Sequence, residues 1–147
     1  MLIDFHTHLF PDELAKKALP PMMATSGIQD VSTNATLSDT LLKMSEWGVD
    51  ISVCLHIATK PKNQKSVNDF ASYVQKNSNG KLLCFGSVHP DAEDAVDELY
   101  RIKEMGLYGI KFHPDYQGFF ADDEKTYKIY KTIEQLKLPV TFHTGVD

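Results

Sequence analysis

The chain opens on a short apolar run that ends in two histidines: residues 2–11 read LIDFHTHLFP. Its length and apolar content suit a strand that is buried on both faces, as the strands of parallel sheets are. In an extended strand, residues i and i+2 point to the same face, so the imidazoles of His6 and His8 project together. Two imidazoles placed in this way can chelate one divalent ion. We therefore expect a metal site at this strand end, the alternative being two polar residues at an ordinary strand terminus.

Four further apolar runs of similar length follow, and they alternate with longer amphipathic segments. The runs expected to form strands, after the first at 2–6, are 50–57, 81–88, 108–112 and 139–143. The segments with apolar residues at helical spacing are 37–47, 66–78, 91–105 and 122–137, the first ending at Gly48. Strand–helix alternation of this kind predicts an α/β fold whose parallel strands are joined by right-handed crossovers.

The connection after the first strand, residues 9–35, is longer than the others. We expect it to contain a short helix at 12–19 that ends before Pro20 and Pro21. A connection of this length is often a lid or a pocket wall, although a loop without a function fits the residues nearly as well.

All six histidines lie at or just past the C-terminal end of an expected strand; they are His6, His8, His56, His89, His113 and His143. In parallel α/β proteins this edge of the sheet binds ligands. Because His143 ends the last strand and Gly145 lets the chain turn close to a ligand, we favour His143 as a metal ligand or a metal-adjacent group over a core histidine bonded to backbone. We expect His89 to line the pocket and His56 to be a satisfied core or rim histidine.

Lys111 and His113 share one face of the fourth strand by the same two-residue parity. A lysine that points into a sheet interior is costly unless it is paired or functional. Lys111 would neutralise a substrate carboxylate or support a charged site residue, and a structural ion pair with an acid of a neighbouring strand explains it equally well. His113 would bind substrate or shuttle protons. Asp4, two residues before His6, would orient a ligand imidazole or form a structural pair.

The composition limits the binding partners and the cellular compartment that we expect for the chain. Fifteen basic against twenty acidic side chains give a formal net charge of -5, which argues against nucleic acid or an anionic membrane as a partner. The apolar runs fall far short of the roughly 20 residues that span a bilayer, and the N-terminus lacks the features of a secretory signal. Cys54 and Cys84 lie in apolar runs, so we expect buried, reduced thiols in a cytoplasmic protein.

Three motifs together carry a resemblance to a known family. They are Asp4-Phe5-His6-Thr7-His8-Leu9-Phe10-Pro11, Gly-Ile-Lys-Phe-His-Pro at 109–114, and Pro-Val-Thr-Phe-His-Thr-Gly at 139–145. In this order they resemble the amidohydrolase superfamily, in the branch of aminocarboxymuconate-semialdehyde decarboxylase-like enzymes. The resemblance implies a (β/α)8 barrel with one divalent metal ion, most commonly Zn²⁺, and it makes His6, His8 and His143 the metal ligands. TatD-type nucleases and histidinol-phosphatase-type phosphoesterases resemble the chain less well.

The chain of 147 residues is shorter than such a barrel, which needs eight strands and roughly 250 residues. We therefore expect one partial barrel domain over 1–147, with 9–35 as an insertion, that holds the first five strands of a TIM-type (β/α)8 barrel and lacks strands 6–8. The sixth-strand histidine and eighth-strand aspartate of the family have no counterpart in a shortened chain of this kind. Exposed barrel edges predict self-association.

The function that this implies is a metal-dependent hydrolase that acts on a small-molecule substrate, with Lys111 and His113 as the catalytic side chains. Non-oxidative decarboxylation of a carboxylate substrate is the alternative, and a non-catalytic remnant is a third possibility. Little turnover is expected of the chain alone. A complete flavodoxin-like five-stranded module fits the strand count, but the chain has no Gly-rich phosphate loop after the first strand.

Overall fold

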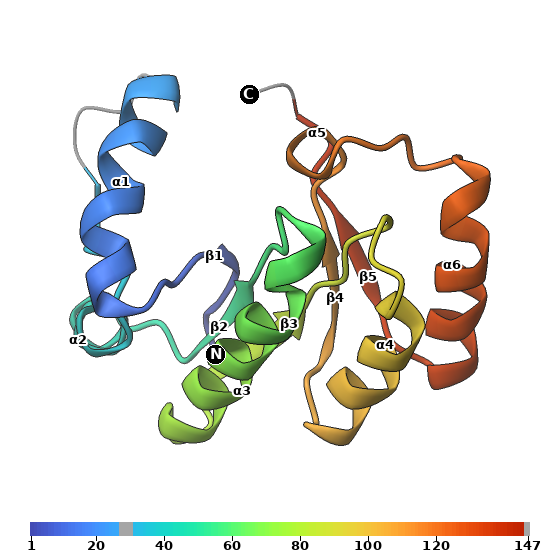
Figure 1. Ribbon diagram of the computed structural model, residues 1–147. Coiled ribbons are helices and arrows are strands. Elements are labelled where there is room, and N and C mark those ends of the chain that lie inside the picture. The colour runs from blue at the N-terminus through green and yellow to red at the C-terminus, as the bar shows by residue number, and fades with distance from the viewer. Residues whose placement is uncertain (27–30, 146–147) are drawn as a thin grey trace.

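Five parallel strands form one sheet in chain order, β1-β2-β3-β4-β5. They are β1 (Ile3–Thr7), β2 (Ile51–Leu55), β3 (Leu82–Gly86), β4 (Gly109–Phe112) and β5 (Val140–Phe142). The computed structural model describes residues 1–26 and 31–145, and its sheet curls into part of a barrel (Figure 1). Pairing in chain order is what the first five strands of a TIM-type barrel require, and it excludes the flavodoxin-like order 2-1-3-4-5.

Helices join successive strands, as the alternating pattern predicts. They are α2 (Leu37–Trp47), α3 (Gln64–Asn77), α4 (Ala95–Glu104) and α6 (Glu124–Leu136). In Figure 1, α3, α4 and α6 lie along one side of the sheet. The expected end of α2 at Gly48 is confirmed, because this residue adopts the left-handed conformation with φ +70° that glycine tolerates best. Two short helices, η1 (Pro61–Asn63) and α5 (Pro114–Gln117), were not predicted.

The helix expected at 12–19 is longer than predicted. α1 spans Asp12–Ser26 and continues through Pro20 and Pro21. A proline inside a helix leaves the carbonyl four residues earlier without its helical partner, here the carbonyls of Lys16 and Lys17. All four residues are exposed, so water can bond these carbonyls and the helix continues on its solvent side.

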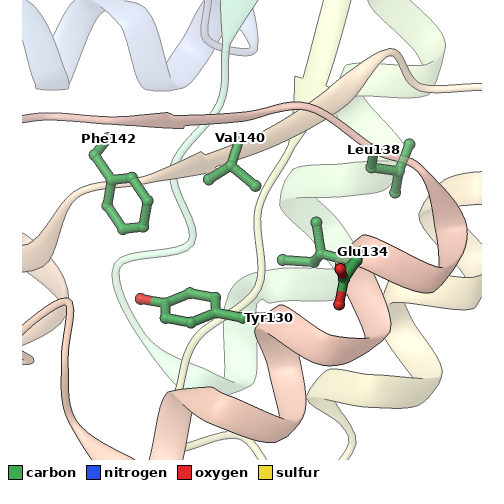
Figure 2. A pocket seen from close by; sticks show the side chains of 6 residues that line it. Tyr130, Glu134, Leu138, Val140 and Phe142 are labelled. Atoms are coloured by element: carbon green, nitrogen blue, oxygen red, sulfur yellow. The ribbon is translucent and has the colours of Figure 1, made fainter.

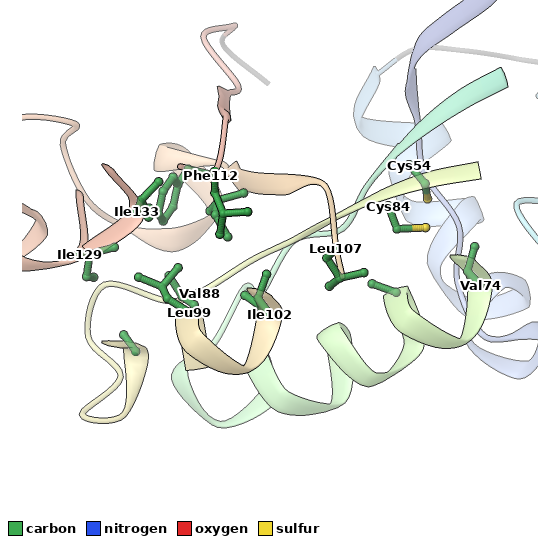
Figure 3. Packing of buried hydrophobic residues seen from close by; sticks show 14 of the residues in the cluster. Cys54, Val74, Cys84, Val88, Leu99, Ile102, Leu107, Phe112, Ile129 and Ile133 are labelled. Atoms are coloured by element: carbon green, nitrogen blue, oxygen red, sulfur yellow. The ribbon is translucent and has the colours of Figure 1, made fainter. Parts of the chain in front are cut away.

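The main core lies between the sheet and its helices (Figure 3). Ile110 and Phe112 of β4 point into this layer together with Leu99 and Ile102 of α4. A second, smaller cluster on the other face of the sheet contains Val53, Leu55 and Phe85. Residues of one strand therefore alternate between the helix layer and the barrel interior, as a strand with period two requires. Cys54 and Cys84 lie in the helix layer as buried free thiols, as expected.

Both outer strands have one neighbour in the described part of the chain. Beside the β5 edge lies an open, apolar hollow of about 310 Å³ between β5 and α6 (Figure 2). On the β1 edge, Ile3 and Phe5 are 49% and 60% exposed. The apolar surface at both edges is what an unclosed barrel leaves uncovered.

Candidate metal centre

One pocket of about 850 Å³ collects most of the histidines at the C-terminal ends of the strands. The histidines that line it are His6, His8, His56, His113 and His143. The prediction that His89 lines the pocket is wrong. This buried side chain accepts a hydrogen bond at Nδ1 from the Asp91 backbone N–H (3.2 Å) and lies outside the lining.

His6 and His8 bring their Nε2 atoms to 3.0 Å from each other. Metal–nitrogen bonds of about 2.0–2.1 Å place two ligand nitrogens of one ion about 3 Å apart, so this spacing is that of a bidentate chelate. A hydrogen bond also fixes the orientation of the His8 ring, because its Nδ1 donates to the carbonyl oxygen of Leu55 at 2.8 Å. The proton on Nδ1 leaves the lone pair on Nε2, which is the tautomer that a metal ligand needs.

The surroundings keep both imidazoles neutral. Burial lowers the pKa of His8 to about 4, with a further contribution from His6. Burial also lowers the pKa of His6, and the charges of Lys111 and His143 act in the same direction. Near neutral pH both rings are therefore uncharged, and each has one nitrogen lone pair with which it can bind a cation.

Asp4 forms a structural contact, which was the second of the two alternatives considered for it. The register between β1 and β2 shifts between Asp4 and Thr7, and a shift of this kind breaks the alternation of faces. The Asp4 carboxylate accepts the backbone N–H of His6 at 3.1 Å. It therefore supports the backbone that carries the first histidine, and no hydrogen bond from Asp4 to an imidazole is found among the described residues.

Lys111 lies in the interior and is 1% exposed. Its Nζ has no hydrogen-bond partner and no ion pair within residues 1–26 and 31–145, so the structural ion pair considered above is not found there. Burial lowers the pKa of this amine. Its charge also lowers the pKa values of His6 and His8, which places Lys111 near both.

His113 is held between two flat side chains. Its ring stacks on His143 at 4.0 Å and on Tyr116 at 3.9 Å between centroids, each within 7° of parallel. Its Nδ1 accepts the Tyr116 backbone N–H at 3.3 Å. A neutral His113 therefore carries its proton on Nε2.

Tyr116 and Gln117 of α5 are site residues that the sequence analysis missed. Gln117 Oε1 accepts the His113 backbone N–H, and its Nε2 donates to the carbonyls of Ala58 and Val88, each at 2.9 Å. One buried amide thus joins the segments that follow β2, β3 and β4. The signal in the sequence was Pro114, since proline favours the first position of a helix and His113 caps that helix.

His143 lies in the pocket lining but apart from the chelate. Among the described residues, the ligand atoms of His6, His8 and His143 do not form a set of three within 4.8 Å of one another. His143 follows β5, an edge strand, and its ring stacks on His113. The role of His143 as third metal ligand remains a prediction.

The long connection after β1 forms a pocket wall, which was one of the two alternatives considered for it. Leu14, Leu19 and Met22 of α1 line the pocket together with Val67 and Phe70 of α3. The site therefore combines one polar edge of imidazoles with an apolar chamber.

A family profile described as Amidohydrolase matches residues 3–147. The chain belongs to the amidohydrolase family. No curated protein matches its sequence. No helix in the described ranges is long and apolar enough to cross a membrane.

Solved structures share the fold of this amidohydrolase. IDCase from Metarhizium anisopliae has a TM-score of 0.74 at 18% identity, covering 97% of this chain and 50% of that one. A 5-carboxyvanillate decarboxylase from Novosphingobium aromaticivorans, with bound manganese, has a TM-score of 0.75 at 16% identity, and the match covers 97% of this chain and 50% of that one. A 2,6-dihydroxybenzoate decarboxylase from Rhizobium has a TM-score of 0.66 at 18% identity, and the match covers 100% of this chain and 51% of that one. The chain therefore spans about half the length of these relatives and matches the barrel half predicted from its strands.

The side chains of this amidohydrolase fit a divalent ion at His6 and His8. The two Nε2 atoms have the spacing of a chelate, and the Leu55 carbonyl fixes the ligand tautomer of His8. Imidazole accepts zinc, iron, cobalt or nickel, and one relative holds manganese. The residues thus agree with a divalent metal, and the choice of zinc remains a prediction.

Proposed function

We propose that this chain carries the metal-binding and carboxylate-binding side of an enzyme that decarboxylates a small aromatic acid without oxidation. The observation that supports it most is the pairing of the His6–His8 chelate with a buried, unpartnered amine at Lys111 in the described part of the chain. A chelate that leaves coordination positions open, next to a buried cation, suits a substrate that brings its own negative charge.

His6 and His8 hold the ion, and His143 is proposed to complete the ligand set when a substrate or further chain is present. The ion, once bound, supplies a Lewis acid that polarises an oxygen of the substrate. Lys111 is buried and is not among the described residues that line the pocket, so we propose that its charge offsets that of a nearby carboxylate without touching it. Its depressed pKa reflects the cost of burying a cation alone, and the arrival of an anion offsets that cost.

His113 is proposed to handle the proton. Loss of carbon dioxide leaves an electron pair on the ring carbon, and that carbon must gain a proton in place of the carboxylate. His113 lines the pocket and, as a neutral ring, holds its proton on Nε2 because Nδ1 accepts the Tyr116 N–H. Stacking between His143 and Tyr116 fixes the ring plane from which the proton leaves.

The apolar chamber indicates the rest of the substrate. Leu14, Leu19 and Met22 on one wall and Phe70 on another suit a flat, apolar ring. The relatives named above act on 5-carboxyvanillate and 2,6-dihydroxybenzoate, which are aromatic acids. An aromatic carboxylate is accordingly the substrate class that we propose.

Metal-dependent hydrolysis is the second proposal, and it rests on the family itself. A bound ion lowers the pKa of water from 15.7 to about 7, but hydrolysis also needs a base to accept the proton. Among the described residues that line the pocket there is no Asp or Glu. A histidine would have to act as the base that accepts the proton from water, so we expect slow hydrolysis from the chain by itself.

The test begins with metal content and continues with substrates. We expect purified chain to bind one manganese ion, which prefers nitrogen and oxygen ligands over thiolate. This ion should be lost in a His6→Ala/His8→Ala variant and kept in His89→Gln, the matched strand-end histidine outside the pocket. Carbon dioxide release is then measured with 2,6-dihydroxybenzoate, and acid release with an aromatic amide. Manganese binding that survives the double variant would contradict the proposed centre, and amide hydrolysis without carbon dioxide release would favour the second proposal.

A further inference from the structure

Two cysteines lie behind the pocket, on the helix side of the sheet, and one histidine of the pocket lining lies beside them. Cys54 of β2 and Cys84 of β3 are register partners on adjacent strands, and Figure 3 shows their side chains next to each other in the apolar layer. His56 follows two residues after Cys54, so the alternation of faces places it on the same side. Its ring nitrogens lie 3.6 and 3.8 Å from the Cys54 sulfur.

One ligand atom from each of these three residues lies within 4.8 Å of the others. Zinc–sulfur bonds of about 2.3 Å and zinc–nitrogen bonds of about 2.0–2.1 Å put sulfur and nitrogen about 3.6 Å apart at a tetrahedral ion. The Cys54–His56 distances fall close to that value. Because both ring nitrogens are almost equally near the sulfur, a rotation of the imidazole turns either lone pair toward a shared ion.

We propose that Cys54, His56 and Cys84 form a second metal site, distinct from His6 and His8, that takes a zinc ion. Thiolate ligands select soft or borderline ions such as zinc and cuprous copper. Zinc fits the surroundings better, since two thiolates cancel its double charge and leave a neutral centre. Both cysteines are fully buried, where a net charge would be expensive.

Zinc reaches this site from the pocket. His56 is 5% exposed and lines the pocket, whereas the two sulfurs lie behind it in the core. His56 is thus the ligand that an entering ion meets first. Without an ion, burial raises the pKa of the Cys54 thiol and the adjacent Cys84 raises it further, so zinc binding displaces protons from sulfur.

The test uses cobalt and zinc on the reduced, metal-free 147-residue chain. Cobalt(II) bound to thiolate gives a ligand-to-metal charge-transfer absorption in the near ultraviolet that histidine ligands alone do not give. We expect this absorption in the unaltered chain and, undiminished, in the His6→Ala/His8→Ala variant. We expect it to disappear in Cys84→Ala, and zinc stoichiometry to fall by one ion per chain relative to the unaltered protein.

His56→Gln provides a second variant that keeps both thiols, and it should weaken cobalt binding at least tenfold without abolishing the charge-transfer signal. Circular dichroism confirms that each variant is folded. Absence of the absorption in the unaltered chain with excess cobalt would overturn the proposal, whatever the variants do. Loss of the absorption in the His6→Ala/His8→Ala variant would also overturn it, because the two sites are then one. Retention of copper in preference to zinc would overturn the assignment of the ion.

Discussion

Strand geometry and two hydrogen bonds arrange His6 and His8. Strand parity sends both imidazoles to one side, the Asp4 carboxylate holds the His6 backbone N–H, and the Leu55 carbonyl fixes the proton of His8. Parity follows from local geometry, so the sequence predicted that His6 and His8 lie together. The sequence left two alternatives open for Asp4, because the shifted register between β1 and β2, which decides between them, depends on two segments far apart in the chain.

The buried histidines predict a loss of stability in acid for the metal-free chain. Burial holds the pKa of His8 at about 4 and that of His56 at about 3, whereas an unfolded histidine titrates near 6.5. The unfolded state therefore binds these protons first. Stability is complete above about pH 6.5 and falls below it, by up to about 1.4 kcal/mol per pH unit for each histidine.

Urea unfolding between pH 7 and pH 4, in the presence of a chelator, measures this loss. The His56→Phe variant should show a smaller decrease in the free energy of unfolding than the unaltered chain over the same range. Equal decreases in the two proteins would contradict the assignment of His56 as a buried neutral ring.

Replacing Lys111 should raise the stability of the chain and lower its affinity for a carboxylate substrate. Lys111→Met removes the unpartnered amine and keeps most of the apolar stem, so the free energy of unfolding should rise by about 1 kcal/mol or more. The affinity of the metal-loaded chain for 2,6-dihydroxybenzoate should fall at least tenfold, since the cation is gone. The exposed Lys131→Met serves as the control and should change neither quantity. A destabilised Lys111→Met variant would show that the amine has a structural partner.

At the level of strands and helices, apolar periodicity predicted most of the fold. The four amphipathic segments became α2, α3, α4 and α6 because each buries one stripe against the sheet. α1 was predicted too short, since the rule that proline ends a helix fails where water can bond the released carbonyls. α5, with four residues, is too short for any periodicity and is fixed instead by the hydrogen bonds of Gln117.

A substitution of Gly109, at the start of β4, tests how closely β4 packs between β3 and β5. A Cβ at this position would lie 2.5 Å from a ring carbon of Phe85 and 2.8 Å from the carbonyl oxygen of Pro139. Gly109→Ala should therefore push β3 and β5 away from β4 and cost about 1–3 kcal/mol of stability. Gly48→Ala, which meets nothing within 4 Å but has φ +70°, should cost about 1–2 kcal/mol from backbone strain alone. Chemical shift changes around Phe85 and Val140 in Gly109→Ala alone distinguish the two causes.

The molecule taken together is a half-barrel with two uncovered edges. The order of its strands could not be predicted from periodicity, because an open flavodoxin-like sheet has the same alternation of elements; the motifs at 4–11, 109–114 and 139–145 favoured the barrel. We propose that the apolar edges are covered by self-association, since Phe5 on β1 and Val140 on β5 are both exposed.

Light scattering at micromolar concentration should therefore give a mass above that of one chain. Val140→Lys, in the hollow between β5 and α6 (Figure 2), should shift the protein toward monomer. Leu42→Lys changes an exposed apolar residue on α2, away from the two sheet edges, and should leave the mass unaltered. A strictly monomeric unaltered chain would contradict the proposal.

Anomalous diffraction from a crystal of the chain grown with manganese is the most direct test of the metal centre. Manganese prefers nitrogen and oxygen ligands over thiolate, so it reports on His6 and His8 and not on the cysteines. We expect one anomalous peak within about 2.3 Å of the Nε2 atoms of both histidines. A crystal with no peak there, or with a peak that touches neither imidazole, would contradict the metal centre and the proposed chemistry together.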